Sequence, residues 1–120
     1  MSAKRDAVAT AIHDLEEAGA RLATTIQESH AGLHESLALL DAGTSLAEIL
    51  EVMGTAERRL QMTVEMGTFE EARHRLRLAV TDAGLEEGMT IAAVGRAFGV
   101  SRQLAAKFAK ELRDEDEQGG

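Results

Sequence analysis

The chain has 120 residues and a formal net charge of −8, with 28% of its residues charged and 44% hydrophobic, which fits one domain or a small domain with an oligomerisation arm. It has no cysteine, which excludes disulfides and thiolate metal sites. It also has no apolar run of about 20 residues and no signal peptide, so we expect a cytoplasmic protein without a membrane partner.

The composition favours an all-α fold with an aliphatic core. Glycine is frequent, proline is absent, and no segment alternates apolar and polar residues as a strand would. Such a chain is expected to form helices that end at glycine caps. Because the sequence has only 3 Phe and no Tyr or Trp, a protomer of this size is expected to need a partner to bury enough apolar surface.

The first predicted element is helical from Asp6 to about Leu40, within an N-terminal oligomerisation region over residues 1–43 that Gly43 closes. Its apolar residues recur at alternating spacings of four and three, which defines a heptad seam. The stretch "SHAGLHES" interrupts this seam with small residues, so the region is either one long helix or a helical hairpin. The members of the seam are Val8, Ile12, Leu15, Gly19, Leu22, Ile26, Leu33 and Leu40.

Short connecting helices are predicted over residues 44–67. Ser45, followed three residues later by Glu48, forms a capping box that begins the first of them. Gly54 separates the two helices, and Gly67 is expected to end the second one. The next domain therefore begins after Gly67.

The C-terminal domain is predicted over residues 68–113, and its first helix over about 69–83. Thr68 and Glu71 form a second capping box at the start of that helix. Its apolar face repeats every three or four residues, and the Arg73–Arg77 cluster projects elsewhere. This helix is the first of three in the domain.

The stretch "TIAAVGRAFGVSRQLAAKFAKEL" predicts a helix over about 90–98, a turn, and a second helix capped by Ser101. Helices joined by so short a turn cross steeply, which requires a small residue where they approach and a left-handed residue in the bend. Gly95 and Gly99 fit these two roles. The other residues expected to pack in the turn and between the helices include Phe98, Val100, Leu104 and Phe108.

This stretch resembles the helix-turn-helix of bacterial DNA-binding proteins, of the trihelical kind found in resolvases and many transcriptional regulators. The resemblance covers about 25 residues directly, and residues 69–112 when the preceding helix is added. Gly95 and Ala105 depart from the usual pattern, in which Ala and a β-branched residue are commoner. The resemblance implies that the second helix lies in the major groove. The residues it assigns to DNA binding are Ser101, Arg102, Gln103, Ala106, Lys107, Lys110, Arg96 and Arg113.

These residue types have distinct roles in DNA recognition. The resemblance implies that Arg102 pairs with guanine and Gln103 with adenine, and that Ala106 allows close approach and contact with a thymine methyl. The other cations neutralise phosphates, together with the Arg73–Arg77 cluster, and the amides at Ser101 offer a positive helix end. The alternative is that these side chains form only the solvated face of an amphipathic helix.

Other kinds of site have weaker support in the sequence. His30 and His34 stand four apart with Glu35 adjacent, but a third metal ligand is missing, so an exposed pair is favoured. No nucleophile lies in a recognisable arrangement with a base, and no phosphate-binding loop follows a strand. We therefore expect neither enzymatic activity nor a cofactor.

Charge is distributed unevenly. Residues 1–57 hold 3 basic and 10 acidic side chains, residues 58–113 hold 10 and 7, and residues 114–120 hold 0 and 4. The basic segment is where a nucleic acid would bind, and the acidic N-terminal half suits a basic protein partner. The acidic tail over residues 114–120 is expected to be disordered.

The leading hypothesis is a sequence-specific regulator that binds double-stranded DNA as a homodimer through its N-terminal helices and associates with the nucleoid. One alternative is a protein-interaction adaptor, in which the acidic half binds a partner and the C-terminal helices only pack. Another keeps DNA binding but assigns it to plasmid partition or phage control.

Overall fold

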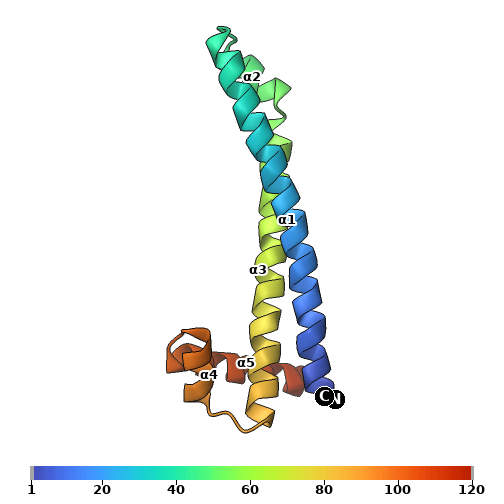
Figure 1. Ribbon diagram of the computed structural model, residues 1–120, viewed down its shortest axis with the longest axis vertical. Coiled ribbons are helices and arrows are strands. Elements are labelled where there is room, and N and C mark those ends of the chain that lie inside the picture. The colour runs from blue at the N-terminus through green and yellow to red at the C-terminus, as the bar shows by residue number, and fades with distance from the viewer. Residues whose placement is uncertain (1, 120) are drawn as a thin grey trace. The chain divides into compact units, whose positions relative to one another are not determined.

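A computed structural model describes residues 2–119, and over that range the chain is all-helical, with five helices and no strand (Figure 1). This confirms the predicted all-α class. The helices are α1 (Ala3–Asp41), α2 (Leu46–Val52), α3 (Thr55–Glu86), α4 (Ile91–Phe98) and α5 (Arg102–Gly119). No helix in the described range is long and apolar enough to cross a membrane.

The N-terminal region forms one long helix, so the alternative of a hairpin inside it is wrong. Helix α1 runs unbroken through "SHAGLHES", where Ser36 Oγ donates to the Gly32 carbonyl at 2.9 Å and Gly32 packs against the Arg58 side chain. The helix ends where the sequence predicts, since Gly43 adopts a left-handed φ of 79° and the Thr44 amide donates to the Leu39 carbonyl.

The chain divides into two compact units, which are described separately. The terminal unit comprises Met1–Leu15 and Glu71–Gly120, and the hairpin unit comprises Glu16–Glu70. In the hairpin unit α1 and α3 lie side by side in opposite directions, with α2 between them in the chain (Figure 1). The Ser45 cap of α2 is confirmed, because its side chain accepts a hydrogen bond from the Glu48 amide at 3.2 Å.

Small residues on α1 face α3 within the hairpin unit. Ala18, Thr25 and Gly32 are buried and follow one another at seven-residue intervals. A methyl group on Gly32 would lie 2.6 Å from Arg58 Nη1, which donates to the Glu28 carbonyl at 3.0 Å. The predicted seven-residue period is therefore present, but the fully buried positions lie one residue before the predicted seam positions, because helices approach closely only where side chains are small.

Helix α3 does not end at Gly67, so the predicted break there is wrong. Gly67 has a helical backbone, and Thr68 does not act as a cap, because its hydroxyl donates to the Val64 carbonyl at 3.1 Å. A single interior glycine costs only about 1 kcal/mol, which a helix of 32 residues tolerates. The predicted first helix of the C-terminal domain is thus the last part of α3.

The acidic C-terminal segment is helical in the described range, in contrast to the disorder expected for it. Helix α5 continues through residues 114–119 to Gly119. Glu, Gln and Arg have high helix propensities and no proline interrupts them, so the helix that begins at Arg102 is extended rather than stopped. Its last turns nevertheless place acids near the negative end of the helix dipole, which makes this end weaker than the rest.

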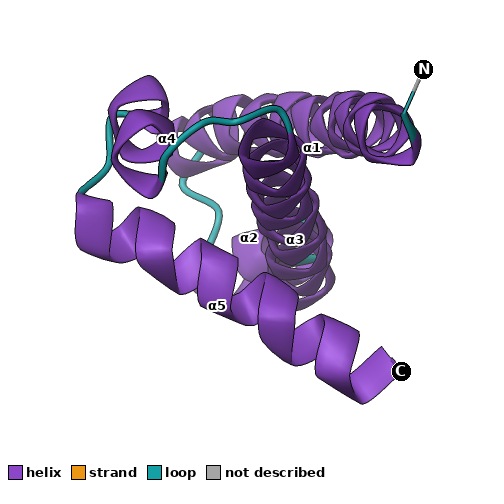
Figure 2. Ribbon diagram, turned by 90° about the horizontal axis from the view of Figure 1, so that it is seen from below, coloured by secondary structure: helices purple, strands orange, loops and turns teal. Residues whose placement is uncertain are grey.

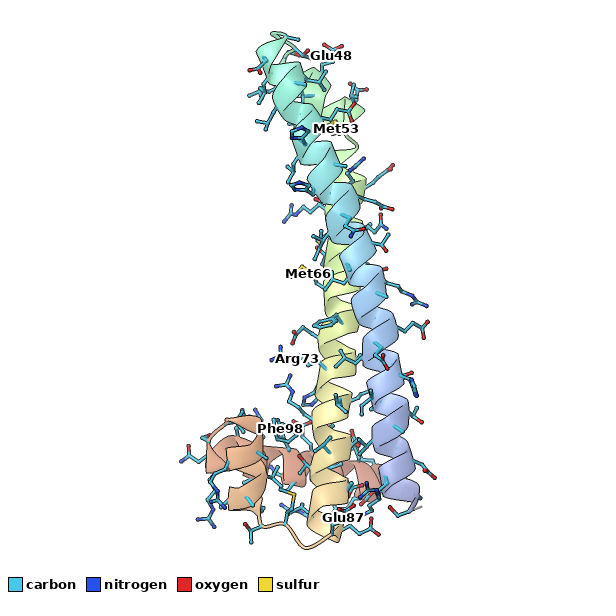
Figure 3. The ribbon with its side chains drawn as sticks, viewed as in Figure 1. Glu48, Met53, Met66, Arg73, Glu87 and Phe98 are labelled. Carbon is cyan, nitrogen blue, oxygen red and sulfur yellow. The ribbon has the colours of Figure 1, made fainter. Side chains whose placement is uncertain are left out.

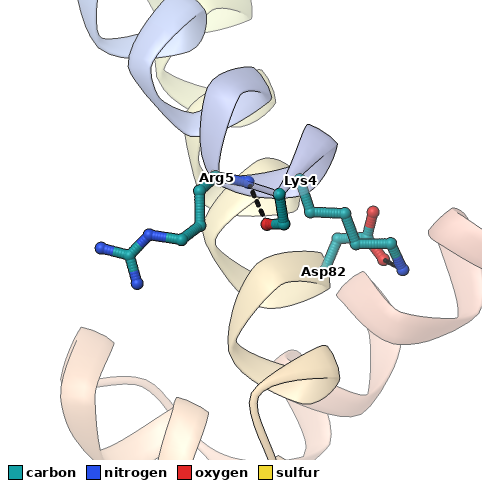
Figure 4. Close-up of polar contacts among 4 residues, drawn as sticks. Lys4, Arg5 and Asp82 are labelled. Atoms are coloured by element: carbon teal, nitrogen blue, oxygen red, sulfur yellow. Dashed lines mark hydrogen bonds and ion pairs between the residues drawn. The ribbon is translucent and has the colours of Figure 1, made fainter.

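The terminal unit has an apolar core made by α3, α4 and α5. Val94 and Phe108 are each only 2% exposed, and Leu78 is buried with them. The Phe108 ring meets the Phe98 ring edge-on, with 6.2 Å between the centroids. On the edge of this unit Lys4 Nζ of α1 lies 3.0 Å from Asp82 Oδ1 of α3 (Figure 4).

Candidate nucleic-acid interface

Helices α4 and α5 are joined by a turn whose local geometry follows from its sequence (Figure 2). Thr90 caps α4 by accepting a hydrogen bond from the Ala93 amide at 3.1 Å. At the other end Gly99 takes a left-handed φ of 69°, which a side chain would strain. The amides of Gly99 and Val100 donate to the carbonyls of Arg96 and Gly95 at 3.2 and 2.9 Å, so the chain reverses with its backbone groups paired.

Gly95 allows α4 to contact the start of α5. A methyl group at this position would lie 3.2 Å from the Val100 carbonyl oxygen and 3.4 Å from that of Ser101. Both neighbours are backbone atoms, which move less readily than a flexible side chain. Gly95 therefore occupies the close approach that the sequence predicts for it.

Helix α5 begins at the predicted cap. The Ser101 hydroxyl accepts a hydrogen bond from the Leu104 amide at 3.1 Å, which satisfies one of the free amides of the first turn. The inner face of the helix is formed by Ala105, Phe108 and Ala109, all buried. Leu104 differs from the prediction, because it is 36% exposed at the border of this inner face, while Ala109 takes the buried position one turn after Ala105.

The basic side chains of α5 lie on its outer face. Arg102, Gln103 and Lys107 are exposed, and Ala106 between them is half-buried. Lys110 and Arg113 are exposed as well and continue the same face at steps of three and four residues. We call these six residues of α5 the basic face. Arg96, at the end of α4, is also exposed.

The outer face of α5 changes sign beyond the basic face. Asp114 follows Lys110 by four residues, and Glu117 follows Arg113 by four, so acids succeed bases along one side of the helix. Because phosphates repel carboxylates, only the N-terminal half of α5 suits a polyanion. The sequence pattern contains this reversal, but it becomes apparent only once residues 114–119 are seen to be helical.

The Arg73–Arg77 cluster does not form a second free cationic surface. Arg75 pairs with Glu71 on its own helix. Arg77 lies over the Phe108 ring, 5.9 Å from its centroid, and its Nε atom is buried without a hydrogen-bond partner. Arg73 is exposed but has an interaction of its own (Figure 3). The role of Arg77 in the core was missed because its spacing alone resembles a surface cluster.

His74 is a further residue whose role was missed. Its Nε2 atom lies 2.8 Å from Glu111 Oε2, which ties α3 to α5, and its ring meets Phe108 edge-on with 6.1 Å between centroids. The isolated histidine carries no signal in the sequence, because its partner is 37 residues away. The pair helps to hold the orientation of α5 against α3, one helical turn after Lys107.

The histidine pair of α1 shows no metal-binding geometry. His30 and His34 are both exposed, and the described residues contain no group of three or more His, Cys, Asp or Glu side chains able to hold a metal ion.

No protein-family model matches the chain, and comparison with curated proteins and with solved structures finds no match either. The function is therefore inferred from the geometry of the chain itself.

Proposed function

We propose that the protein binds double-stranded DNA sequence-specifically through α5, as a homodimer, and acts as a small transcriptional regulator at the nucleoid. The observation that supports this most is the exposed basic face at the start of a helix whose inner side is fixed in a core. Arginine and glutamine at the start of such a helix match the base edges of the major groove.

The dimensions of the basic face suit the groove. From Arg102 to Arg113 the helix rises about 16 Å at 1.5 Å per residue, and the major groove is about 12 Å wide. Arg102 and Gln103 are adjacent, so they reach neighbouring bases. Ala106, which is half-buried, has a small side chain between Arg102, Gln103 and Lys107. The helix backbone can therefore approach the bases closely.

The remaining cations contribute affinity without sequence preference. Lys107, Lys110 and Arg113 lie along α5, and Arg96 lies on the helix that crosses before it. Each phosphate that such a residue neutralises releases counterions, so the binding constant falls steeply with salt. One module of this size binds weakly, and a dimer presenting two copies of α5 to half-sites about 34 Å apart, or a multiple, restores affinity.

A second candidate is an adaptor that binds another protein. The observation in its favour is the hairpin unit, which combines exposed apolar side chains with 10 acidic residues and 3 basic ones. In that case α5 would be only a solvated helix. DNA binding in plasmid partition or phage control uses the same contacts as transcriptional regulation and differs in the sites recovered.

Selection of bound duplexes from a random pool, followed by titration of salt, tests the proposal. A DNA-binding regulator is expected to enrich a palindrome and to lose affinity about linearly on a log–log plot against salt concentration. No enrichment, together with no retention on duplex or heparin at low salt, would contradict DNA binding and favour the adaptor.

A further inference from the structure

The hairpin unit leaves one continuous face of large apolar side chains exposed. Each of its members is between 47% and 67% exposed. On α1 these residues share one stripe, because they follow one another at steps of seven, four and three residues. We call this the apolar face, and its members are Ile26, Leu33, Leu37, Leu40, Leu46, Leu50 and Met66.

A groove of about 490 Å³ lies within this face, entirely inside the hairpin unit. Leu33 and Leu40 of α1 line it together with Leu46 and Leu50 of α2, and α3 contributes Met62. Met66 follows Met62 by one helical turn and continues the face along α3 (Figure 3). The charged residues of the lining are the arginines at 58 and 59.

The hairpin unit buries little on its own. Of its large apolar residues only Ile49 and Met53 are buried, and the buried residues of α1 in this unit are the small Ala18, Thr25 and Gly32. Contiguous apolar patches of a few hundred Å² on soluble proteins often mark a contact site. Two antiparallel helices that expose an apolar stripe typically complete their core with a further pair of helices.

We propose that the apolar face is the dimer interface and that its occupant is the same face of a second copy of this chain. The proposal rests on the proposed function, which requires two copies of α5 on one duplex. It also revises the predicted dimer contact, because Leu15 and Leu22 of the heptad seam are half-buried within the chain, whereas Ile26, Leu33 and Leu40 are exposed.

The extent and pattern of the apolar face match a second copy. Seven apolar side chains that are each about half exposed present on the order of 400 Å² of apolar surface. A standard interface buries about 800 Å² per partner, roughly 60% of it apolar, so the two amounts are of the same order. A stripe repeating every seven residues fits another helix with the same repeat, which the second copy supplies.

Charge gives this dimer a salt dependence opposite to that of DNA binding. Each hairpin unit holds 10 acidic and 3 basic residues, so two units repel each other at low ionic strength. Added salt screens this repulsion and strengthens apolar association, whereas it weakens binding to duplex. A basic protein partner on the same face would instead dissociate as salt rises.

Sedimentation equilibrium of the full chain and of two matched variants tests the proposal. Leu33→Asp lies in the apolar face, and Leu60→Asp is the control, since the two leucines are 67% and 66% exposed and Leu60 lies outside the groove. We expect Leu33→Asp to weaken dimerisation at least 100-fold and Leu60→Asp to leave it unchanged. Circular dichroism checks that both variants remain helical.

A single-thiol experiment supplies an independent readout, because the chain has no cysteine. Under mild oxidation at least one of the single variants Leu33→Cys, Leu37→Cys and Leu40→Cys, the one nearest the two-fold axis, is expected to form a disulfide-linked dimer, whereas Val64→Cys on another face of the unit is not. A wild-type chain that stays monomeric at low and high salt would overturn the proposal and leave another helical protein as the occupant. Equal loss of dimer in both aspartate variants would also overturn it.

The two proposals fail separately. Leu33→Asp is expected to bind a half-site as a monomer if α5 reads DNA, so loss of dimer with retained half-site binding supports both. A dimer that depends on Leu33 but binds no duplex would keep the interface and reject the DNA-binding function. Binding of duplex by a wild-type chain that stays monomeric would keep the DNA-binding function and reject the proposed dimer interface.

Discussion

The two units of this chain distribute their side chains in opposite ways. The terminal unit buries large residues, Val94 and Phe108 among them, and presents charged and polar side chains outward on α5. The hairpin unit buries small residues at its helix contact and exposes large ones such as Leu33. The first arrangement is a complete core with a surface suited to a polyanion, and the second is an incomplete core suited to another apolar surface.

The largest expected effect is a difference between the two units in the free energy of unfolding that is lost when a large apolar side chain is removed. Phe108→Ala removes the ring on which Phe98, His74 and Arg77 pack, so we expect a loss of about 3–5 kcal/mol in the free energy of unfolding. Leu40→Ala, at a side chain 47% exposed, is expected to cost much less in a dilute monomeric sample. Urea denaturation of both variants measures the difference. Similar losses would contradict the contrast between the units.

The same substitution at two glycines is expected to act with opposite sign. Gly95→Ala places a methyl 3.2 Å from the Val100 carbonyl oxygen, which should destabilise the chain by about 1–3 kcal/mol and reduce DNA binding. Gly67→Ala meets nothing within 4 Å on a helical backbone, so it should stabilise by about 1 kcal/mol. Thermal unfolding compares them, and stabilisation by Gly95→Ala would refute the close approach.

Neutralising the acids at the end of α5 is expected to strengthen DNA binding, besides removing their unfavourable interaction with the helix dipole. Replacing Asp114, Glu115, Asp116 and Glu117 by their amides removes the repulsion between this end of the helix and phosphates. We expect several-fold tighter binding to random duplex at low salt, measured by fluorescence anisotropy. The amides of Glu48 and Glu51 in the hairpin unit serve as control and should leave binding unchanged. No gain in the first variant would show that the acidic turns lie away from DNA.

The smallest expected effect concerns the ion pair at the edge of the terminal unit. Hydrogen bonding to Asp82, and then the charge of its carboxylate, raise the pKa of Lys4 above its usual value of 10.5. Because the folded-state pKa is the higher one, this contribution to stability is present at neutral pH and is lost as pH rises through the folded value. Lys4→Met should therefore be slightly less stable than wild type at pH 7, and the difference should vanish at strongly alkaline pH. A difference that grows with pH would contradict this sign.

Local features were predictable from the sequence, and features that depend on distant partners were not. The caps at Ser45 and Ser101 and the turn at Gly99 follow from interactions within about six residues, and the structure places them as predicted. The continuity of α3 through Gly67 was missed because a glycine and a following threonine were given too much weight as a helix end, although one interior glycine costs a helix only about 1 kcal/mol. The helical state of residues 114–119 was missed because charge composition was weighed above helix propensity.

In the candidate site, too, features within one helix were predictable and contacts between helices were not. The exposure of Arg102, Gln103 and Lys107 followed from their helical phase relative to Phe108, a relation within one helix. The contact of Arg77 with Phe108 and the pair between His74 and Glu111 join two helices far apart in sequence, and no local pattern specifies them. The exposed stripe through Leu33 became recognisable only when the smaller residues of α1 were seen to face α3.

Binding of the variants Arg102→Ala and Lys107→Ala to a panel of single-base variants of the selected site tests most directly whether α5 reads DNA. We expect Arg102→Ala to flatten the preference at one base position by about 1–3 kcal/mol. Lys107→Ala should weaken binding to every member of the panel alike and lower the salt slope by about one. Equal, sequence-independent losses for both variants, or no loss for either, would contradict the account.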